Sequence, residues 1–496
     1  MSTLPQISIK YADRKAICVH EQVAKLGPVS RAAGMDCECP LYACNKVNYA
    51  KSVFKQTARG KRMENQNRVI IVGAGASGMM AAITAARNGA RVTVLEAMER
   101  PGKKLLTTGN GRCNLTNMDP ELPKRYHGAD ASFVQPVLEQ FDAQEVRNFF
   151  GRLGLLTIEK NGYVYPYTNQ ASSVLEMLLA ELRRWKVKLK LMEKVEAITC
   201  EDRIWKVRTG TWTYEAERLI LSCGSKCAPT TGSDGSGYRL AKMAGLKLIP
   251  VVPALAPLLC EGKTPALAAG VRSMAEVSLW QRKKQDMRPD GADDWRFVAS
   301  ELGEVQWTKY GISGIAVFQL SRYVAAEKGA MTFQVTLDLL KPCLEEQKME
   351  RAVLQEMLWR RAGQLPSEPV GMLLRGILNE KLIPLMLNQA GIRSKLQCRE
   401  LTEKELCTLL DVCRSYALVV DGTKSFDICQ VCAGGVDVAQ ISPKTMECKC
   451  IPGLYVTGEL LDVDGPCGGY NLQWAWASGY AAGRSAASER KESVKF

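Results

Sequence analysis

The sequence has few histidines and no long apolar run. Only two of its 496 residues are His, namely His20 and His127. The most apolar stretch, Leu248 to Leu259, is short and contains three prolines, whereas a helix that crosses a bilayer needs about 20 apolar residues. The first residues lack the basic and apolar segments of a secretory signal, and we find no internal repeat or low-complexity tract. We therefore expect no membrane span and a cytoplasmic location.

Cysteine, in contrast, is abundant, with 18 residues. In a chain without an export signal, these are expected to be reduced thiols rather than a disulfide framework. Two pairs, Cys429-x-x-Cys432 and Cys448-x-Cys450, superficially resemble a zinc ribbon. Because the second pair has C-x-C spacing, we expect no metal at this place.

The formal net charge of +14 suits an anionic partner such as a carboxylate, a phosphate or nucleic acid. The charge is unevenly distributed, since residues 1–62 hold 11 Lys and Arg against 4 Asp and Glu, a net charge of +7. The rest of the chain is only mildly basic. We therefore expect an anionic small molecule as partner and no nucleic acid.

Residues 1–62 form a basic segment without sustained periodicity. We expect it to be either not native or disordered, because "RGKR" before Met63 is readable as a translated ribosome-binding site. The alternative is a genuine extension in which the cluster Cys37, Cys39 and Cys44, together with Cys18, binds a metal or an iron–sulfur centre.

A nucleotide-binding pattern begins directly after Met63. The segment 68–72, "RVIIV", predicts a buried strand, 76–89 an Ala-rich helix, and 91–96, "RVTVLE", a second strand. Between the first strand and the helix lies "GAGASG", a G-x-G-x-x-G motif in its full strand–helix–strand context. In that context Gly73 permits the tight turn, Gly75 lets the backbone approach a pyrophosphate, and Gly78 allows close packing.

The start of this helix, with Ala76 and Ser77, offers free N–H groups to phosphates. Glu96, at the end of the second strand, would accept hydrogen bonds from ribose hydroxyls and would repel a 2′-phosphate. The ligand is therefore NAD or the ADP half of FAD.

The rest of the chain favours FAD over NAD. There is no second strand–GxGxxG–helix unit, and a dehydrogenase would have only two histidines to use as acid or base. The C-terminal segment 457–483 fits a flavin, since Glu459 follows a strand, glycines such as Gly469 let the backbone pass a flat ring, and a helix starts near Asn471. The N-terminus of that helix would stabilise negative charge on a reduced flavin.

The middle of the chain changes character. Residues 251–340 alternate in the manner of strands, and residues 341–418 are helical and charged. Strand-like pieces also follow the helix predicted at 172–185. We predict an α/β fold with a discontinuous Rossmann-like FAD-binding domain, residues 63–250 and 419–496, interrupted by a β-barrel-like unit, 251–340, and a helical unit, 341–418.

Four blocks of the sequence are familiar: "VIIVGAGASGMMAA", "GKKLLTTGNGRCNLTN", "TTGSDGSGYRLAKMAG" and a long block from "GGVDVAQ" to "GYAAG". With them, the chain resembles a bacterial family of FAD-dependent flavoproteins, often labelled aminoacetone-oxidase-like, which includes the flavoprotein of the bile-acid 7-dehydroxylation operon. The segment between Cys432 and Cys448 matches a strand–turn region of this family, which also weighs against zinc.

The resemblance implies roles for individual residues. Dinucleotide contacts are implied for Gly75, Ser77, Gly78 and Glu96, and a backbone contact to adenine for Val195. Flavin-side contacts are implied for Lys104, Asn110, Gly111, Arg112 and Cys113, and for Gly458, Glu459, Gly469, Asn471 and Leu472 at the C-terminus. One departure is that Cys223 and Gly224 stand where relatives usually have a Gly-Gly pair.

The resemblance also implies a reaction. We expect NAD(P)H to serve as a transient electron donor and the substrate to be an enone whose conjugated C=C bond is reduced, such as a 3-dehydro-bile acid. The substrate would be apolar with a carboxylate or a CoA group. Tyr310 and Tyr470 are the candidates for the hydroxyl that protonates the substrate. The alternatives are a flavin amine oxidase acting on aminoacetone-like substrates and a flavin-bearing nucleic-acid or regulatory binding protein.

Overall fold

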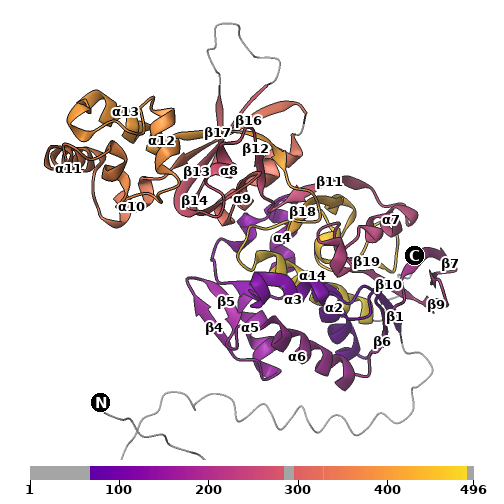
Figure 1. Cartoon of the computed structure of the whole chain (residues 1–496). Coiled ribbons are helices and arrows are strands. Elements are labelled where there is room, and N and C mark those ends of the chain that lie inside the picture. Colours follow the sequence, from indigo (N-terminus) through magenta and orange to yellow (C-terminus); the bar gives the residue numbers. More distant parts are fainter. Residues whose placement is uncertain (1–66, 284–294, 328, 489–496) are drawn as a thin grey trace, which may run out of the picture. The chain divides into compact units, whose positions relative to one another are not determined.

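The computed structural model describes residues 67–283, 295–327 and 329–488 (Figure 1). The described residues all belong to one compact unit. The predictions for residues 1–62, including their cysteine cluster, lie outside the described residues. Within the described ranges, no helix has both the length and the apolarity needed to cross a membrane.

A five-stranded parallel sheet organises the first region. Its strand order is β19 (Leu454–Val456), β10 (Arg218–Leu221), β1 (Arg68–Val72), β2 (Arg91–Leu95) and β6 (Lys188–Lys190). The central strands are almost entirely buried, as expected for a parallel sheet covered by helices on both faces. Strand β19 comes from the C-terminal part of the chain, so the predicted discontinuous Rossmann-like fold is confirmed.

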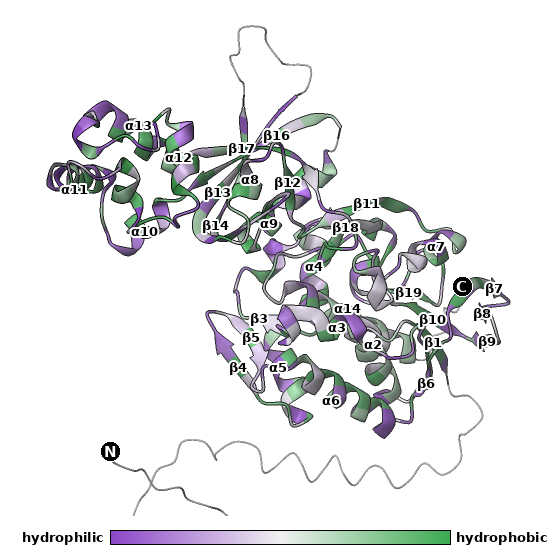
Figure 2. Cartoon of the chain, in the orientation of Figure 1, coloured by the Kyte–Doolittle hydropathy of each residue, from purple (hydrophilic) through white to green (hydrophobic). Residues whose placement is uncertain are grey.

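The helices of this region pack tightly because small residues face one another. Helix α14 (Tyr470–Ala487) lies against α2 (Ala76–Arg87). A side chain on Gly479 or Gly483 of α14 would collide with the carbonyl oxygens of Ser77 and Ala81 in α2. Helix α6 (Ala171–Arg184) packs on the other side of α2 and shows both apolar and polar residues in Figure 2.

The remaining elements of this region are short. They are α3 (Lys103–Thr107), α4 (Ala131–Leu138), α5 (Ala143–Arg152), α7 (Ser236–Met243), a sheet of β3 (Thr116–Asn117), β5 (Tyr163–Pro166) and β4 (Thr157–Lys160), and a sheet of β7 (Val195–Glu201), β8 (Ile204–Thr209) and β9 (Thr213–Ala216).

The inserted region contains a closed antiparallel barrel. Its strand order is β12 (Leu258–Cys260), β15 (Gly311–Ser313), β14 (Arg296–Thr308), β13 (Arg272–Lys283), β16 (Met331–Asp338) and β17 (Tyr416–Thr423). Two helices accompany it, α8 (Thr264–Leu267) and α9 (Ile315–Ala326). Inward side chains such as Val277, Leu279 and Trp307 are fully buried, which explains the alternating pattern of these strands.

The predicted helical unit follows β16. It consists of α10 (Lys341–Glu346), α11 (Arg351–Gln364), α12 (Ile383–Gln389) and α13 (Glu403–Arg414) (Figure 1). Its buried residues, such as Leu358 and Leu410, belong to the same hydrophobic core as the barrel residues. The barrel and the helices therefore share one core, separate from that of the parallel sheet.

Two chain segments connect the inserted region to the parallel-sheet region. Strand β11 (Leu248–Ala254) pairs with β18 (Val431–Val436) in a separate antiparallel ribbon. Strand β11 spans the predicted boundary at residue 250, and the last barrel strand β17 spans the predicted boundary at residue 418. The inserted β-rich and helical units are confirmed, while the exact domain boundaries stay predictions.

Candidate functional site

A cavity of about 730 Å³ lies where the parallel-sheet region meets the barrel. Most of the predicted cofactor residues line it: Gly73, Gly75, Ala76, Ser77, Glu96, Lys104, Asn110, Arg112, Val195, Gly458, Glu459, Gly469, Asn471 and Leu472. The volume is within the range of cofactor and small-molecule sites. The structure therefore brings together residues that are almost 400 positions apart in the chain.

The glycine-rich loop adopts the shape that its motif predicts. Gly73 has a φ of +103°, and a Cβ there would lie 2.5 Å from the carbonyl oxygen of Ser222. A Cβ on Gly78 would collide with the carbonyl oxygen of Gly73, so Gly78 is needed for packing and does not line the cavity. A Cβ on Gly75 would meet nothing within 4 Å. Gly75 thus leaves open space at the N-terminus of α2, where N–H groups favour an anion.

Glu96 closes this part of the cavity. Its carboxylate accepts hydrogen bonds from the backbone N–H groups of Ala74, at 2.7 Å, and Met98, at 2.9 Å. Burial raises the pKa of Glu96, and the backbone hydrogen bonds only partly oppose this rise. The two oxygens retain free lone pairs that could accept from ribose hydroxyls.

The asparagine- and glycine-rich stretch 107–117 forms a wall of the cavity. Gly109, Asn110 and Gly111 all have positive φ, which Gly and Asn tolerate best. The Arg112 guanidinium lies 5.5 Å from the centre of the Tyr165 ring, which also lines the cavity. Gly111 supports this turn without lining the cavity.

The next two residues of the stretch differ in role. Cys113 is fully buried, outside the cavity lining, and burial raises the pKa of its thiol to about 12. It is therefore a packed, protonated thiol. Asn114 lines the cavity, and its buried Oδ1 atom has no hydrogen-bond partner. An unsatisfied buried oxygen of this kind is costly unless a ligand group donates to it.

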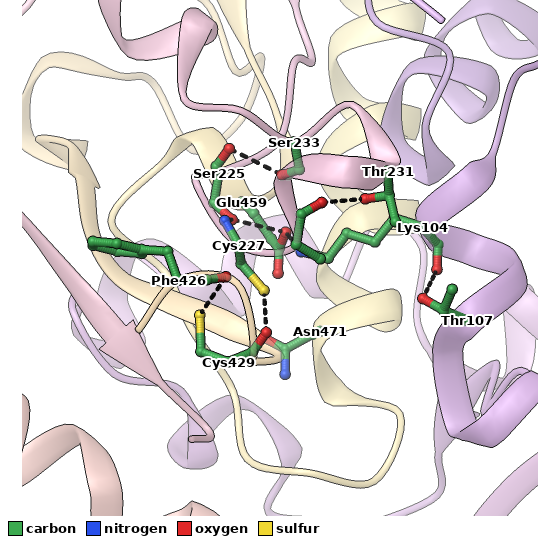
Figure 3. Close-up of polar contacts among 12 residues, drawn as sticks. Lys104, Thr107, Ser225, Cys227, Thr231, Ser233, Phe426, Cys429, Glu459 and Asn471 are labelled. Carbon is green, nitrogen blue, oxygen red and sulfur yellow. Dashed lines mark hydrogen bonds and ion pairs between the residues drawn. The ribbon is translucent and has the colours of Figure 1, made fainter. Parts of the chain in front are cut away.

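A partly buried ion pair, predicted to contact the flavin, lines the cavity. The Lys104 ammonium is 2.5 Å from Oε2 of Glu459, and the Ser225 hydroxyl donates to the same oxygen at 3.3 Å (Figure 3). Burial alone would lower the pKa of Lys104, but the charge and hydrogen bond of Glu459, together with the interactions of Cys227 and Cys432, outweigh it, so the pKa is raised. Lys104 therefore stays positively charged at neutral pH.

The N-terminus of α14 meets the stretch 107–117 across the cavity. Gly469 has a φ of +96°, and a Cβ there would lie 2.6 Å from the backbone carbonyl of Thr116. The Asn471 amide is occupied by the preceding loop, because it donates to the Gly465 carbonyl and accepts from the Gly465 N–H. The first backbone N–H groups of α14 have no acceptor within the helix, and Asn471 and Leu472 of this first turn line the cavity.

The wall opposite the glycine-rich loop comes from the inserted region, and none of its lining residues was predicted from the sequence. Arg272, at the start of β13, pairs with Glu304 of β14 at 3.1 Å. The Arg272 side chain is 63% exposed and the Glu304 side chain is 49% exposed. Around them lie Gln306, Ser313 and the apolar side chains Leu255, Ile315 and Phe318. No motif marks these residues, because their common position follows only from barrel closure.

The structure does not bring the two predicted catalytic tyrosines to the cavity. Tyr310 lies in the turn between β14 and β15, where the Lys424 ammonium is 3.9 Å from its ring centre. The Tyr470 hydroxyl donates to Asp119 at 2.8 Å, and its side chain is buried. Neither residue lines the cavity, whereas Tyr163 and Tyr165 of β5 do.

A further set was missed although its sequence block carried part of the resemblance. Thr231, Gly232 and Ser233 in "TTGSDGSG" line the cavity, as does Cys223. The Cys223 thiol donates to the Val72 carbonyl at 3.6 Å, so a side chain is accommodated where relatives have glycine. The glycines and hydroxyl residues of this block were the available signal.

The residues present fit FAD. Gly75 and the start of α2 leave room for a pyrophosphate, and Glu96 offers hydrogen-bond acceptors for a ribose. The Asn114 oxygen has no partner in the protein, so it can accept a hydrogen bond from a ligand. Lys104, Glu459 and the start of α14 line the same cavity. A dinucleotide with a diphosphate and a ribose has partners among these groups.

Comparison with known proteins agrees with this geometry. Residues 67–485 match the family model of the HI0933-like protein Rossmann domain. The chain belongs to this family. It is 44% identical to the 3-dehydro-bile acid delta(4,6)-reductase of Clostridium scindens over 428 residues, which are 85% of this chain and 99% of that protein.

Two other similarities are more distant. The chain is 28% identical to the ribosomal RNA dihydrouridine synthase of Haemophilus influenzae, over 85% of this chain and 99% of that protein. The solved 3-ketosteroid delta1-dehydrogenase of Sterolibacterium denitrificans aligns with 85% of this chain and 100% of its own, at 12% identity and a TM-score of 0.43. That score is too low for the likeness to bear on function.

These findings confirm the predicted family, fold class and cofactor: the chain is a FAD-dependent oxidoreductase of the HI0933-like Rossmann family. The predicted exclusion of nucleic acid is not confirmed, because one relative acts on ribosomal RNA. NAD(P)H as donor and the roles of individual site residues stay predictions.

Proposed function

We propose that this protein is an NAD(P)H-driven reductase of a conjugated C=C bond in a steroid-like enone that carries a carboxylate or a CoA group, such as a 3-dehydro-bile acid. The observation that carries the proposal is the 44% identity, along 99% of its length, to a 3-dehydro-bile acid delta(4,6)-reductase. The more distant relative is a dihydrouridine synthase. In uridine the C5=C6 double bond is conjugated with a carbonyl, and in dihydrouridine this bond is saturated. Both names are therefore consistent with reduction of a conjugated C=C bond.

The inserted wall supports the substrate class. Leu255, Ile315 and Phe318 offer an apolar surface of the kind that a steroid skeleton would cover. Arg272 is the cation that this wall contributes, and it would hold a carboxylate at the end of the skeleton. Since its present partner Glu304 is largely exposed, the pair can open at modest cost.

The opposite wall would hold the cofactor. The start of α2 and Gly75 would bind the pyrophosphate, Glu96 the ribose, and Lys104 with Glu459 the flavin half. When bound, FAD supplies the hydride-transfer chemistry. The N-terminal end of α14 would favour negative charge near its N–H groups, which stabilises the reduced state.

Tyr165 replaces Tyr310 and Tyr470 as our candidate proton donor. It lines the cavity beside Arg112. Burial raises the pKa of Tyr165, and the positive charge of Arg112 only partly opposes this. The hydroxyl therefore stays protonated at neutral pH and is available to donate to a substrate carbanion or enolate.

The decisive experiment is anaerobic. Purified protein is mixed with NADH or NADPH and a 3-oxo-Δ4,6 steroid acid. We expect the ultraviolet band of the conjugated ketone to disappear and the product to be heavier by two hydrogen atoms for each C=C bond reduced. The matching saturated ketone serves as the control and should leave the nicotinamide cofactor unconsumed beyond background. Reduction of the flavin by NAD(P)H without any change in the steroid would contradict the proposal.

Two further assays separate the alternatives. Peroxide formation from an aminoacetone-like amine in air, without enone reduction, would support the amine oxidase. Conversion of uridine in a ribosomal RNA, measured by mass spectrometry of its nucleosides, would point to the reaction of the second relative instead.

A further inference from the structure

Three cysteines from two distant segments meet beside the cavity. Cys227 lies in the loop after β10, Cys429 lies just before β18, and Cys432 lies within β18. All three are at most 4% exposed and form a small cluster with Ala256. Cys227 and Cys429 also line the cavity. The cluster is therefore shielded from bulk solvent but adjacent to the space that ligands enter.

The thiols of this cluster are in contact. The Cys227 thiol donates to the backbone carbonyl of Cys429 at 2.6 Å (Figure 3). The Cys429 thiol donates to the Phe426 carbonyl at 3.6 Å, and Cys432 lies in the same buried cluster as Cys227 and Cys429 (Figure 3). A backbone hydrogen bond from Ala228 to Phe426, at 3.0 Å, holds the two segments together.

The surroundings of the cluster have opposite effects on the two C-x-x-C thiols. Interactions with Cys227 and Cys432, together with burial, raise the pKa of Cys429, whereas the pKa of Cys432 is lowered. A hydrogen bond from Cys429 lowers the pKa of Cys432, and burial only partly opposes this; the Ser225 side chain acts in the same direction as Cys429. The Lys104 ammonium is close enough to interact with both Cys227 and Cys432. Hydrogen-bond donors and a nearby cation are the features that activate thiols toward exchange.

A metal site does not explain the cluster. Among the residues that the structure describes, no group of three or more His, Cys, Asp or Glu side chains could hold a metal ion. Cys448, the start of the second pair in the zinc-like pattern, is buried in the core of the parallel-sheet region, and Cys450 is exposed. The C-x-x-C pair thus meets Cys227 rather than the C-x-C pair.

We propose that Cys429 and Cys432 are a reversible dithiol–disulfide site that reacts with low-molecular-weight disulfides entering the cavity. Two cysteines in C-x-x-C spacing with contacting thiols can form a disulfide with little backbone movement. The site is independent of the proposed reductase activity, since its reaction needs neither the enone nor NAD(P)H.

The chemistry proceeds in two exchange steps. The cavity-facing Cys429 thiol passes its proton to the Cys432 thiolate as it reacts. It attacks one sulfur of R–S–S–R, forms a mixed disulfide and expels R–S⁻, which takes up a proton. The Cys432 thiol loses its proton and attacks the Cys429 sulfur, which forms the internal disulfide and expels the second R–S⁻, again protonated. The small disulfide is reduced to two thiols, and the protein dithiol is oxidised; excess thiol reverses the reaction.

Oxidation of the two cysteines would change the charge near the Lys104–Glu459 ion pair. The internal disulfide removes the negative charge that Cys432 presents to Lys104. It also removes the hydrogen bond that the Cys429 thiol donates to the Phe426 carbonyl. The redox state of the pair would therefore change the electrostatic surroundings of Lys104 and Glu459.

The test uses the full-length holoenzyme in anaerobic mixtures of reduced and oxidised glutathione, followed by acid quenching, alkylation and digestion with trypsin. Cys429 and Cys432 fall in one tryptic peptide, 425–444, and Cys227 in another, 227–239. As the proportion of oxidised glutathione rises, we expect the peptide 425–444 to carry no alkyl group and to be two hydrogen atoms lighter than the free dithiol peptide, and we expect both sites to be alkylated again after reduction. A cross-link between the two peptides would overturn the proposed pairing.

Single variants test the order of steps. In Cys432→Ser, we expect glutathione to remain attached to Cys429, because no second thiol displaces it. In Cys429→Ser, neither the internal disulfide nor the adduct should form. Cys467→Ser is the matched control, since Cys467 also lines the cavity but does not contact this cluster, and it should behave as the wild type. A peptide 425–444 that stays fully alkylated in oxidised glutathione alone would overturn the proposal without any variant.

Discussion

The two walls of the cavity are built in different ways. The wall of the parallel-sheet region is made largely of backbone, with glycines at positions where a side chain would collide or block access, as at Gly73, Gly75 and Gly469. The wall of the inserted region is made of side chains on barrel strands, among them Arg272, which no local motif announces. A backbone wall suits a constant cofactor, and a side-chain wall can be changed residue by residue to suit a substrate.

This comparison predicts that chemistry and substrate choice can be damaged separately. The largest effect is expected at Tyr165, since loss of a general acid reduces turnover by about 10²- to 10⁴-fold. Tyr165→Phe should lower kcat with the enone while leaving reduction of the flavin by NAD(P)H unchanged. Tyr310→Phe and Tyr470→Phe are the controls, because neither side chain lines the cavity. Equal losses in Tyr470→Phe would restore that residue as the donor.

The second prediction concerns the ion pair that joins the two regions. Asp464, in the loop before α14, pairs with Arg322 of α9 at 2.7 Å. Burial raises the pKa of Asp464 to about 6, despite the charge of Arg322, and its Oδ1 atom has no partner. An aspartate in an unfolded chain titrates near pH 4.

Between these two pKa values the folded protein keeps a proton that the unfolded chain has released. The stability contribution of Asp464 is therefore complete at low pH and is lost as the pH rises from about 4 to about 7, by up to roughly 3 kcal/mol. Thermal unfolding across this range should show the loss in the wild type and not in Asp464→Asn. Parallel pH profiles for both proteins would show that Asp464 is ionised throughout.

The third prediction addresses the inserted wall alone. Arg272→Gln should raise KM for a carboxylated enone by about 10- to 150-fold, since a hydrogen bond between charged groups contributes about 1.5–3 kcal/mol. FAD retention should be unchanged. Glu304→Gln is the matched opposite, because it frees Arg272 and should lower KM. If both variants leave KM for the acid and for its neutral amide unchanged, Arg272 does not bind the carboxylate.

The sequence was informative where backbone geometry restricts residue type. Strands β1 and β2, helix α2 and the roles of Gly73 and Gly78 follow from local pattern, because a turn with positive φ or a helix–strand contact admits only glycine. Glu459 followed from its place after a strand, and the resemblance added Lys104 and Asn110. These residues lie in the sequence blocks that carry the family resemblance, and they line the same cavity.

Contacts that depend on long-range packing could not be read in the same way. Arg272 and Glu304 face each other because β13 pairs with β14 in the closed barrel, and Cys227 meets Cys429 across 202 positions of chain. The tyrosines illustrate the same limit, since the sequence provides fifteen of them and no pattern distinguishes Tyr165 in the cavity from Tyr470 bound to Asp119.

The last prediction isolates the backbone wall. Gly75 has an ordinary φ of −81° and open space at its Cβ position, so Gly75→Ala should fold as the wild type does. The added methyl would occupy the approach of the pyrophosphate, and such overpacking costs about 1–3 kcal/mol, which corresponds to roughly 5- to 150-fold weaker FAD binding.

Gly78→Ala should instead lower the melting temperature of the FAD-free protein, because its methyl collides with the Gly73 carbonyl inside the fold. Fluorescence titration with FAD and thermal unfolding without it separate the two effects. Unchanged FAD affinity in Gly75→Ala would mean that the pyrophosphate does not lie against this loop, and the distinction between the two walls would have to be drawn elsewhere.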